Sequence, residues 1–115
     1  MQRHLRLKHR DDFRRLRREG RVYRHACLML SVAPNHLMHN RYGMITGKRV
    51  GHAVTRNRIR RQLRAVTRLL HPRLHQGHDI VIIAHPAIVE QPFAQIQRIV
   101  RQHCEQANLL KDNQS

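Results

Sequence analysis

Apolar residues recur along this chain with two periods, one typical of helices and the other typical of strands. The clearest helical pattern follows Gly51, where Ile59, Leu63, Val66 and Leu70 are three or four positions apart. Because each helical residue turns by about 100°, these four side chains share one narrow face that needs a hydrophobic core. The pattern predicts a long amphipathic helix that ends near residue 70.

A weaker helical pattern lies near the N-terminus. Residues 10–19 fit a helix whose start Asp11 or Asp12 could cap and whose end Gly20 could stop. Residues 1–9 are basic and lack a clear period, so we expect them to form an extended, flexible arm.

Strand patterns account for most of the remaining chain. Residues 21–33 predict two short strands, and residues 42–45 predict a third one just before the long helix. Residues 79–84 are a continuous apolar run rich in β-branched side chains, as expected for a strand covered on both faces. Residues 92–108 predict a last helix, and residues 109–115 a frayed tail.

The order of these elements bounds the fold. Helix, strands, helix, strand and helix in succession predict one sheet covered by helices, of the α+β or α/β class. A chain of 115 residues forms one small domain, and we assign residues 10–108 to it.

Charge is distributed very unevenly along the chain. The net charge is +16, and no acidic residue occurs between Glu19 and Asp79, an interval that holds twelve Lys and Arg. Such a field indicates a nucleic-acid partner, with a solvated basic surface as the alternative.

Arginines follow one side of the predicted long helix. Arg56, Arg60, Arg64 and Arg68 are four positions apart, with Asn57 and Arg61 on their flank. Like charges at this spacing cost a few tenths of a kcal/mol per pair, and no neighbouring carboxylate offsets the cost. We therefore expect phosphates to neutralise this ridge, since planar guanidinium groups suit them.

Several classes of protein fit the sequence poorly. No apolar run approaches the length of a membrane span, and the charged N-terminus lacks the apolar region of a secretory signal. Isolated Cys27 and Cys104 then predict reduced thiols in the cytoplasm.

The sequence also gives little support for catalysis by the protein itself. Only seven residues are acidic, whereas metal-assisted phosphodiester cleavage needs carboxylates to hold the ions. His71, His75 and His78 have spacings that a metal could use, but Pro72 interrupts the segment, and we expect them to be loop histidines.

The basic segment carries a specific motif. Residues 47–64 read GKRVGHAVTRNRIRRQLR, which closely resembles the signature of the bacterial ribonuclease P protein subunit. That signature is a basic pair followed by G-x-A-V-x-R-N-x-x-(K/R)-R-x-x-R. Arg-Leu at 6–7, Asp-Phe at 12–13 and the run DIVIIA from residue 79 agree with the family in order, so the resemblance covers roughly residues 4–106.

The resemblance implies a fold. The family has a single α-β-β-β-α-β-α sandwich of the α+β class, similar to domain 2 of ribosomal protein S5, with a central sheet and a left-handed β-α-β crossover. General rules favour a right-handed crossover, so the left-handed expectation rests on the resemblance alone.

The resemblance also implies a function. Family members are protein cofactors of a ribonucleoprotein endonuclease that removes the 5′ leader from precursor tRNA, with the catalytic RNA subunit performing the cleavage. The implied partners are that RNA and precursor tRNA, with no membrane and no obligate protein partner. Mg²⁺ would be held mainly by the RNA, and no metal by the protein.

The resemblance implies two sets of site residues, at the positions that match the family's functional residues. The RNA-binding set is Lys48, Arg49, Arg56, Asn57, Arg58, Arg60, Arg61 and Arg64. The set expected to bind the single-stranded leader is Phe13, Arg17, Met29 and Ser31.

The leader-binding set departs from the family pattern. Arg17 and Ser31 stand where members often have aromatic residues, and Phe13 could also be a core residue. Since stacking is worth about 1–3 kcal/mol per base, leader binding is either weaker here or carried by Arg17 through stacking or phosphate contact.

Two other classes of function are compatible with the charge. A structural RNA-binding protein of the ribosomal or assembly type would bind RNA without stimulating tRNA maturation. A stand-alone nuclease or a DNA-packaging protein is the third possibility.

Overall fold

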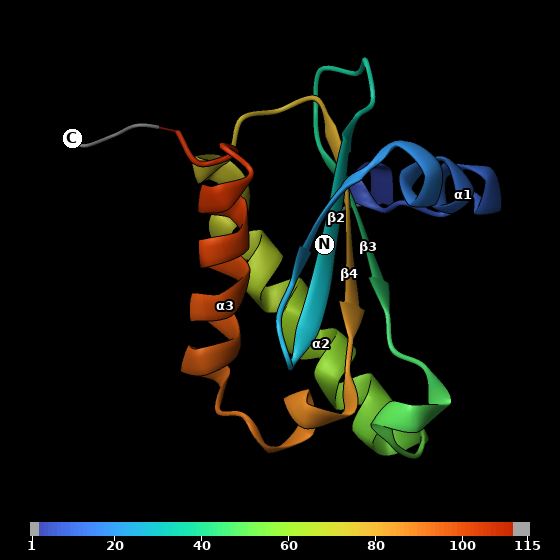
Figure 1. Cartoon of the computed structure of the whole chain (residues 1–115), viewed down its shortest axis with the longest axis vertical. Coiled ribbons are helices and arrows are strands. Elements are labelled where there is room, and N and C mark those ends of the chain that lie inside the picture. Colours follow the sequence, from blue (N-terminus) through green and yellow to red (C-terminus); the bar gives the residue numbers. More distant parts are fainter. Residues whose placement is uncertain (1–2, 112–115) are drawn as a thin grey trace.

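The structure, a computed structural model, describes residues 3–111 and contains a four-stranded sheet with helices on both faces (Figure 1). The helices and strands are α1 (Arg10–Glu19), β1 (Arg21–Arg24), β2 (Leu28–Pro34), β3 (Arg41–Ile45), α2 (Ala53–Leu70), β4 (His78–Ala84) and α3 (Phe93–Gln106). Short 3-10 turns are η1 (Arg3–Leu5), η2 (Lys48–Val50), η3 (His71–Arg73) and η4 (Pro86–Glu90).

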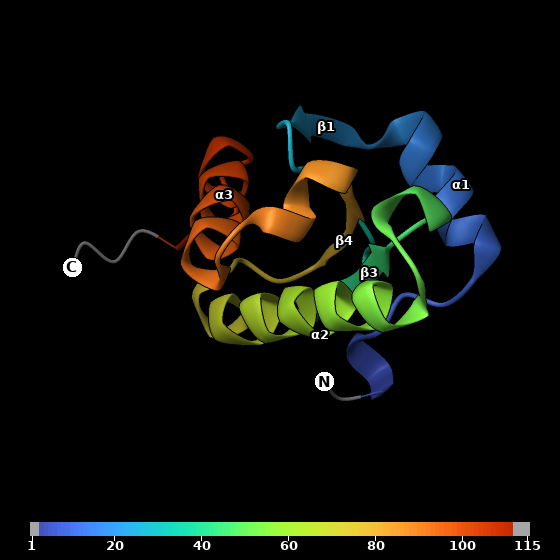
Figure 2. The same cartoon turned by 90° about the horizontal axis from the view of Figure 1, so that it is seen from below.

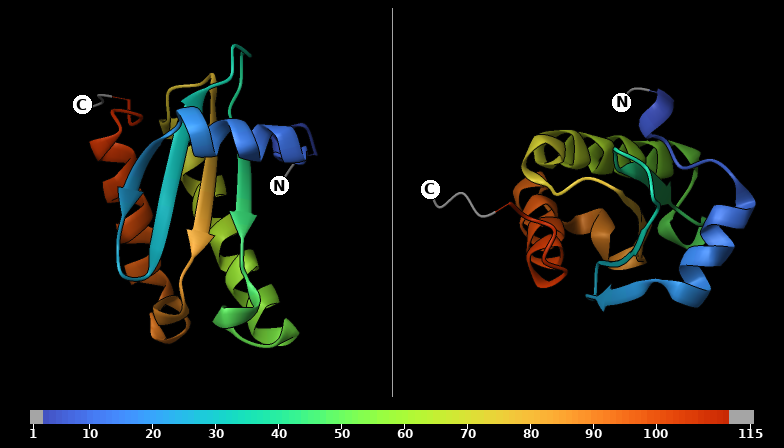
Figure 3. Two further views of the ribbon diagram at one scale, coloured as in Figure 1. Left: turned by 45° about the vertical axis from the view of Figure 1, so that its right-hand side comes forward. Right: turned by 90° about the horizontal axis from the view of Figure 1, so that it is seen from above.

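The strands lie in the order β1-β2-β4-β3, with β3 parallel to β4 and the other pairs antiparallel. Helix α1 covers one face of the sheet, and α2 and α3 cover the other (Figure 2). The β3-α2-β4 crossover passes behind the sheet and is left-handed (Figure 3). This confirms the expected α+β sandwich, including the hand that general rules do not favour.

Two apolar clusters hold the layers together. The larger one joins the sheet to α2 and α3, and it buries the four predicted α2 residues to 4% exposure or less. The smaller one lies beneath α1 and contains Leu7, Leu16, Ala33 and Val81. The narrow apolar face predicted for α2 is therefore confirmed.

The chain ends depart from the predicted domain boundaries. Instead of an extended arm, residues 3–5 form a turn, and Leu7 is buried beneath α1 with its N–H donating to the Tyr42 carbonyl at 2.8 Å. Leu109 is also buried, and Leu110 pairs with Leu74. Residues 109–111 are thus not frayed, because apolar side chains anchor them. Residues 1 and 2 of the predicted arm and residues 112–115 of the predicted tail lie outside the described part.

The expected acidic cap of α1 is also wrong. His9 is the N-cap residue and makes no side-chain capping bond. Asp12 lies in the first turn and pairs with Arg41 at 3.4 Å instead. The end of α1 was predicted correctly, because Gly20 donates its N–H to the Leu16 carbonyl.

Asp79 joins four parts of the fold at the start of β4. Its buried carboxylate accepts hydrogen bonds from Arg15 of α1 at 2.5 Å, Arg41 of β3 at 2.8 Å and Asn35 of the loop after β2 at 3.0 Å. Burial alone would raise the pKa of Asp79, but the hydrogen bonds from Arg41 and Asn35 and the charges of Arg41 and Arg15 hold it below its ordinary value. The carboxylate therefore stays ionised and fixes α1 on the sheet.

No helix within residues 3–111 combines the length and apolarity that a membrane span requires.

The Asp79 network predicts a large loss of stability on neutralisation. We expect Asp79→Asn to lower the unfolding free energy by about 3 kcal/mol, because it leaves two arginines without their buried counter-charge. Urea denaturation would measure this loss. Asp11→Asn, at an exposed position in α1, should change stability by less than about 0.5 kcal/mol; equal effects would contradict the role of Asp79.

His103 predicts a pH dependence of stability. Its ring is 4% exposed, and neither nitrogen has a hydrogen-bond partner within the described chain. Burial, and then the charge of His25, lower its pKa in the folded protein, so the unfolded state binds the proton more readily. Stability should therefore be complete above the ordinary histidine pKa of about 6.5 and fall as pH drops below it.

Urea denaturation at about pH 7.5 and about pH 5.5 tests this dependence. His103→Phe should lose less stability on acidification than the unmodified chain, with a residual loss from His71 and His78, whose pKa values are also lowered by burial. His36→Asn, at an exposed loop position, should retain the full loss. An unchanged loss in His103→Phe would refute the assignment.

Candidate nucleic-acid interface

A sharp turn brings the basic pair to the start of α2. Val50 is buried and anchors η2, which carries Lys48 and Arg49 on its exposed side. Gly51 has φ +151°, and a Cβ there would meet Thr55 at 3.0 Å, so this turn favours glycine. The result is a hollow of about 500 Å³ lined by Lys48, Gly51, His52, Ala53 and Arg56.

The N-terminus of α2 makes this hollow attractive to anions. His52 is the N-cap residue but forms no side-chain capping bond, and the first turn contains no acidic residue. The first backbone N–H groups of the helix and its positive dipole end are therefore available. Arg56 lines the hollow and adds a cation, so the hollow combines helix N–H donors with the positive charge that a phosphate requires.

The arginine ridge continues along α2 from this point. Arg60 donates to the Thr46 hydroxyl at 2.9 Å and to the Asn57 side chain at 3.2 Å, and these bonds orient its guanidinium. Burial, followed by the charges of Arg6 and Arg60, lowers the pKa of Arg64. The ridge is thus a region where cations lie close to one another.

Among the described residues, no carboxylate forms an ion pair with the ridge. The ion pairs among residues 3–111 involve only Arg14, Arg15 and Arg41, with Asp11, Asp12 and Asp79 as their acids. Not one of these arginines belongs to α2. The predicted lack of internal counter-charge is therefore confirmed for the described residues.

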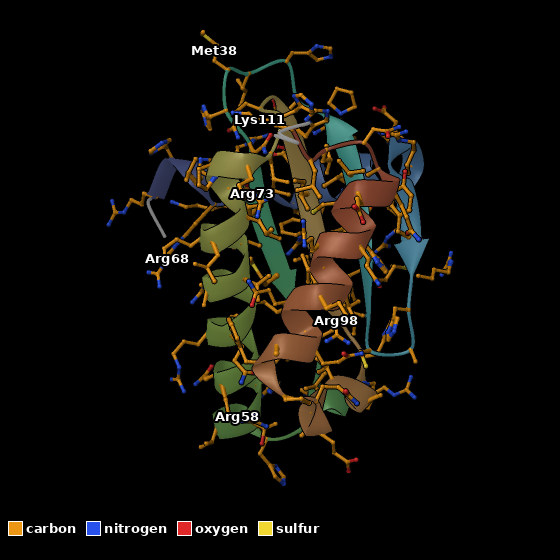
Figure 4. The ribbon with its side chains drawn as sticks, turned by 90° about the vertical axis from the view of Figure 1, so that its left-hand side faces the viewer. Met38, Arg58, Arg68, Arg73, Arg98 and Lys111 are labelled. Atoms are coloured by element: carbon orange, nitrogen blue, oxygen red, sulfur yellow. The ribbon has the colours of Figure 1, made fainter. Side chains whose placement is uncertain are left out.

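One predicted RNA-binding residue lies apart from the others. Arg58 lies on the opposite flank of α2 from Arg60, and its guanidinium donates to the Val89 carbonyl of η4 at 3.4 Å. In Figure 4, Arg58 lies near η4, whereas Arg68 extends away from α3. Asn57 and Arg61 are exposed beside the ridge. The structure thus brings together seven of the eight predicted residues, Lys48, Arg49, Arg56, Asn57, Arg60, Arg61 and Arg64, around the ridge and its N-terminal hollow.

The four residues expected to bind a leader line one cavity. Phe13, Arg17, Met29 and Ser31 border a space of about 210 Å³ between α1 and the sheet. The positions that match the family's leader-binding residues therefore lie around one cavity, which we call the α1 cleft.

Ser31 forms the closed end of the α1 cleft. Its hydroxyl donates to the Leu16 carbonyl at 3.4 Å and is 6% exposed. A Cβ on Gly20 would approach this hydroxyl to 2.6 Å, so glycine allows the end of α1 to lie close over β2. Ser31 is therefore a wall of the α1 cleft and offers no surface on which a base could stack.

Phe13 and Arg17 differ in how far they are exposed to solvent. Phe13 is half-buried, and its ring packs so closely on β3 that a Cβ on Gly43 would meet it at 2.9 Å. It is both a core residue and a wall of the α1 cleft. Arg17 is exposed, so its guanidinium can reach a ligand by stacking or by phosphate contact.

The α1 cleft contains residues that the sequence reasoning missed. They are Leu16, Val22, Arg24, Ile45, Val81 and Ile83. Val22 pairs with Ser31 and Arg24 pairs with Met29 across β1 and β2, so they share the same face of the sheet. The alternation of side chains along β1 places Val22 and Arg24 on one face. It could have identified them as cleft residues only if the register of β1 with β2 had been known.

The three histidines with metal-like spacing do not gather within the described chain. His71 turns toward Tyr42, and residues 3–111 contain no group of three His, Cys, Asp or Glu that could share a metal ion. Cys27 and Cys104 are buried and unpaired, and burial raises the pKa of Cys104 to about 12. Such thiols are protonated and unreactive at neutral pH.

Comparison with known proteins agrees with this geometry. The family model described as Ribonuclease P matches residues 1–108. The Ribonuclease P protein component of Roseiflexus sp. is 45% identical over 116 residues, spanning 100% of this chain and 95% of that protein. The one from Chloroflexus aggregans is 45% identical over 109 residues, spanning 90% of this chain and 81% of its own length.

A solved structure has the same fold. The RNase P protein of Staphylococcus aureus superposes with a TM-score of 0.85 at 25% identity, covering 93% of this chain and 98% of that one. Sequence and structure therefore agree that this chain belongs to the ribonuclease P protein family, whose members are components of a tRNA-processing enzyme together with the RNase P RNA.

Proposed function

We propose that this protein binds the catalytic RNA of ribonuclease P through α2 and the single-stranded leader of precursor tRNA through the α1 cleft, in the cytoplasm and without an obligate protein partner. The RNA subunit then cleaves off the 5′ leader. The observation that carries this proposal is the α2 ridge, whose arginines have no carboxylate partner among the described residues.

The chemistry of the ridge suits the backbone of folded RNA. A-form helices hide their base edges in a deep major groove, so a row of guanidinium groups meets phosphates and shape. Binding through Arg60 and Arg64 should therefore depend weakly on sequence and strongly on salt, since each phosphate contact releases counterions. The N-terminal hollow of α2 would hold one further phosphate.

The α1 cleft suits an extended single strand. Its floor is apolar, with Val81 and Ile83, and Arg17 and Arg24 supply cations. Single-stranded nucleic acids bind such grooves through phosphates and base faces. With no aromatic side chain at positions 17 and 31, we infer that Arg17 carries much of the leader contact.

The protein is not expected to perform the cleavage. Mg²⁺ prefers carboxylate and water oxygens, and the most buried carboxylate, Asp79, is occupied by Arg15, Arg41 and Asn35. We propose that Mg²⁺ is held mainly by the RNA. The protein would lower the Mg²⁺ concentration that the complex needs by screening phosphate repulsion.

Reconstitution with the catalytic RNA and a precursor tRNA tests the proposed function. The unmodified protein should restore cleavage at low Mg²⁺, whereas protein alone should not cleave. Arg56→Ala with Arg60→Ala should raise the Mg²⁺ requirement and weaken assembly by about tenfold or more, because two phosphate contacts are lost.

Arg98→Ala with Arg101→Ala, at exposed positions on α3, is the matched control and should change the Mg²⁺ requirement little. Tight RNA binding without stimulation of cleavage would favour a structural RNA-binding protein, and cleavage by the RNA-free protein would favour a nuclease.

The α1 cleft generates a separate prediction. Arg17→Ala should weaken binding of a precursor with a leader by about tenfold while leaving mature tRNA binding unchanged, because only the precursor reaches this cleft. Fluorescence-monitored titration of the reconstituted complex would measure both affinities. Arg18→Ala removes the same charge next to the α1 cleft without lining it, and an equal effect there would contradict a specific contact by Arg17.

A further inference from the structure

A larger hollow lies outside both of these sites, between the C-terminal half of α2, the edge strand β3 and the N-terminal turn. Its volume is about 600 Å³, and its lining includes three histidines, His4, His39 and His71, together with Leu5, Tyr42 and Arg68. The N-terminal turn lies beside α2 in the views from below and from above (Figures 2 and 3). Within residues 3–111, no acidic side chain lines this hollow, which we call the histidine pocket.

A chain of hydrogen bonds orients one ring in the histidine pocket. The Asn40 side-chain N–H donates to the Tyr42 hydroxyl at 3.2 Å, and that hydroxyl is 2.7 Å from Nδ1 of His71. Burial raises the pKa of Tyr42 to about 12, so the hydroxyl keeps its proton at neutral pH. Burial, and then the charges of His39, His4 and Lys111, lower the pKa of His71.

These contacts favour one tautomer of His71. The Tyr42 oxygen already accepts from Asn40, and its own O–H points the hydrogen bond toward His71. A neutral imidazole that accepts this hydrogen bond at Nδ1 carries its own hydrogen on Nε2. Within residues 3–111, no hydrogen bond is formed by Nε2 of His71. The ring therefore presents an unused donor, held in place by Asn40 and Tyr42.

The other groups suit a nucleotide. Arg68 extends the ridge one turn beyond Arg64, and its guanidinium can take a phosphate in a bidentate manner. The rings of His4 and His39 meet edge to face with centroids 5.2 Å apart, and Nε2 of His39 lies 3.2 Å from the His4 carbonyl oxygen. Histidine rings are among the side chains on which unpaired RNA bases stack, and the volume is within the range of small-molecule sites.

We propose that the histidine pocket binds one unpaired nucleotide of the RNA partner, with its phosphate on Arg68 and Nε2 of His71 and its base against His4 and His39. Naming RNA as the source rests on the proposed function. The preference for a nucleotide rests on the residues of the pocket alone.

Binding can be measured on the full-length protein with labelled histidines by NMR. At about 150 mM salt, which screens loose surface contacts, adenosine 5′-monophosphate should shift the ring signals of His4, His39 and His71 together. Inorganic phosphate should shift mainly His71, and adenosine should shift mainly His4 and His39. Absence of a joint shift with the monophosphate would overturn the proposal.

Two variants locate the ligand. Arg68→Gln should weaken binding of the monophosphate by about tenfold, as expected for loss of a charge-assisted hydrogen bond, while Arg98→Gln on α3 should leave it nearly unchanged. His71→Phe keeps the ring but removes the donor and should also weaken binding; if it fails to fold, Arg68→Gln decides. Equal losses in the Arg68 and Arg98 variants would refute the site.

The source of the nucleotide is tested in the reconstituted complex. The RNA subunit should protect His71 from carbethoxylation, detected by mass spectrometry, by about fivefold or more, as expected for a buried contact. Binding of the monophosphate without this protection would overturn RNA as the occupant and assign the pocket to a free nucleotide. Neither result depends on cleavage, so the proposed function can fail or succeed separately in the reconstitution assay.

Discussion

The account depends on the unbalanced charge of α2. One face of this helix is fixed by Ile59, Leu63 and Val66, which are completely buried against the sheet and α3. The packed face fixes the backbone positions of the arginines beside it, so their cations stay on one side of the helix. Their repulsion is small per pair, a few tenths of a kcal/mol, but within the described chain no carboxylate reduces it. Binding of an anionic partner removes this repulsion, and the relief adds to the binding free energy.

The few acidic residues are used elsewhere, and this distribution has a structural reason. Asp79 and Asp12 bind Arg41 and so hold α1 and β3 together at one end of the sheet. The α1 cleft exists because α1 is held at this end while Gly20 lets its other end approach β2. Acids therefore position the helix that forms the cleft, and within the described residues they leave the cations of α2 unpaired, as the proposed RNA contact requires. The two surfaces lie on opposite sides of the sheet, so a ligand in one does not block the other.

The sequence predicted the core of this arrangement well. Helix α2 and the burial of β4 follow from strong apolar patterns, and the left-handed crossover could be expected only from the family motif. The chain ends were predicted poorly, because the burial of Leu7 and Leu109 depends on tertiary contacts that a basic or polar context hides. Arg58 shares the motif, but its side chain reaches η4, an element that the sequence pattern did not predict. The histidine pocket combines residues from five segments and has no sequence signal of its own.

The salt dependence of affinity for the catalytic RNA tests the central claim most directly. Each phosphate neutralised by α2 should contribute about 0.7–0.9 to the slope of log affinity against log salt concentration. Replacing Arg60, Arg61 and Arg64 together by Gln should therefore reduce that slope by about two to three. An unchanged slope in a folded variant would show that RNA does not supply the counter-charges of α2, and would contradict the account.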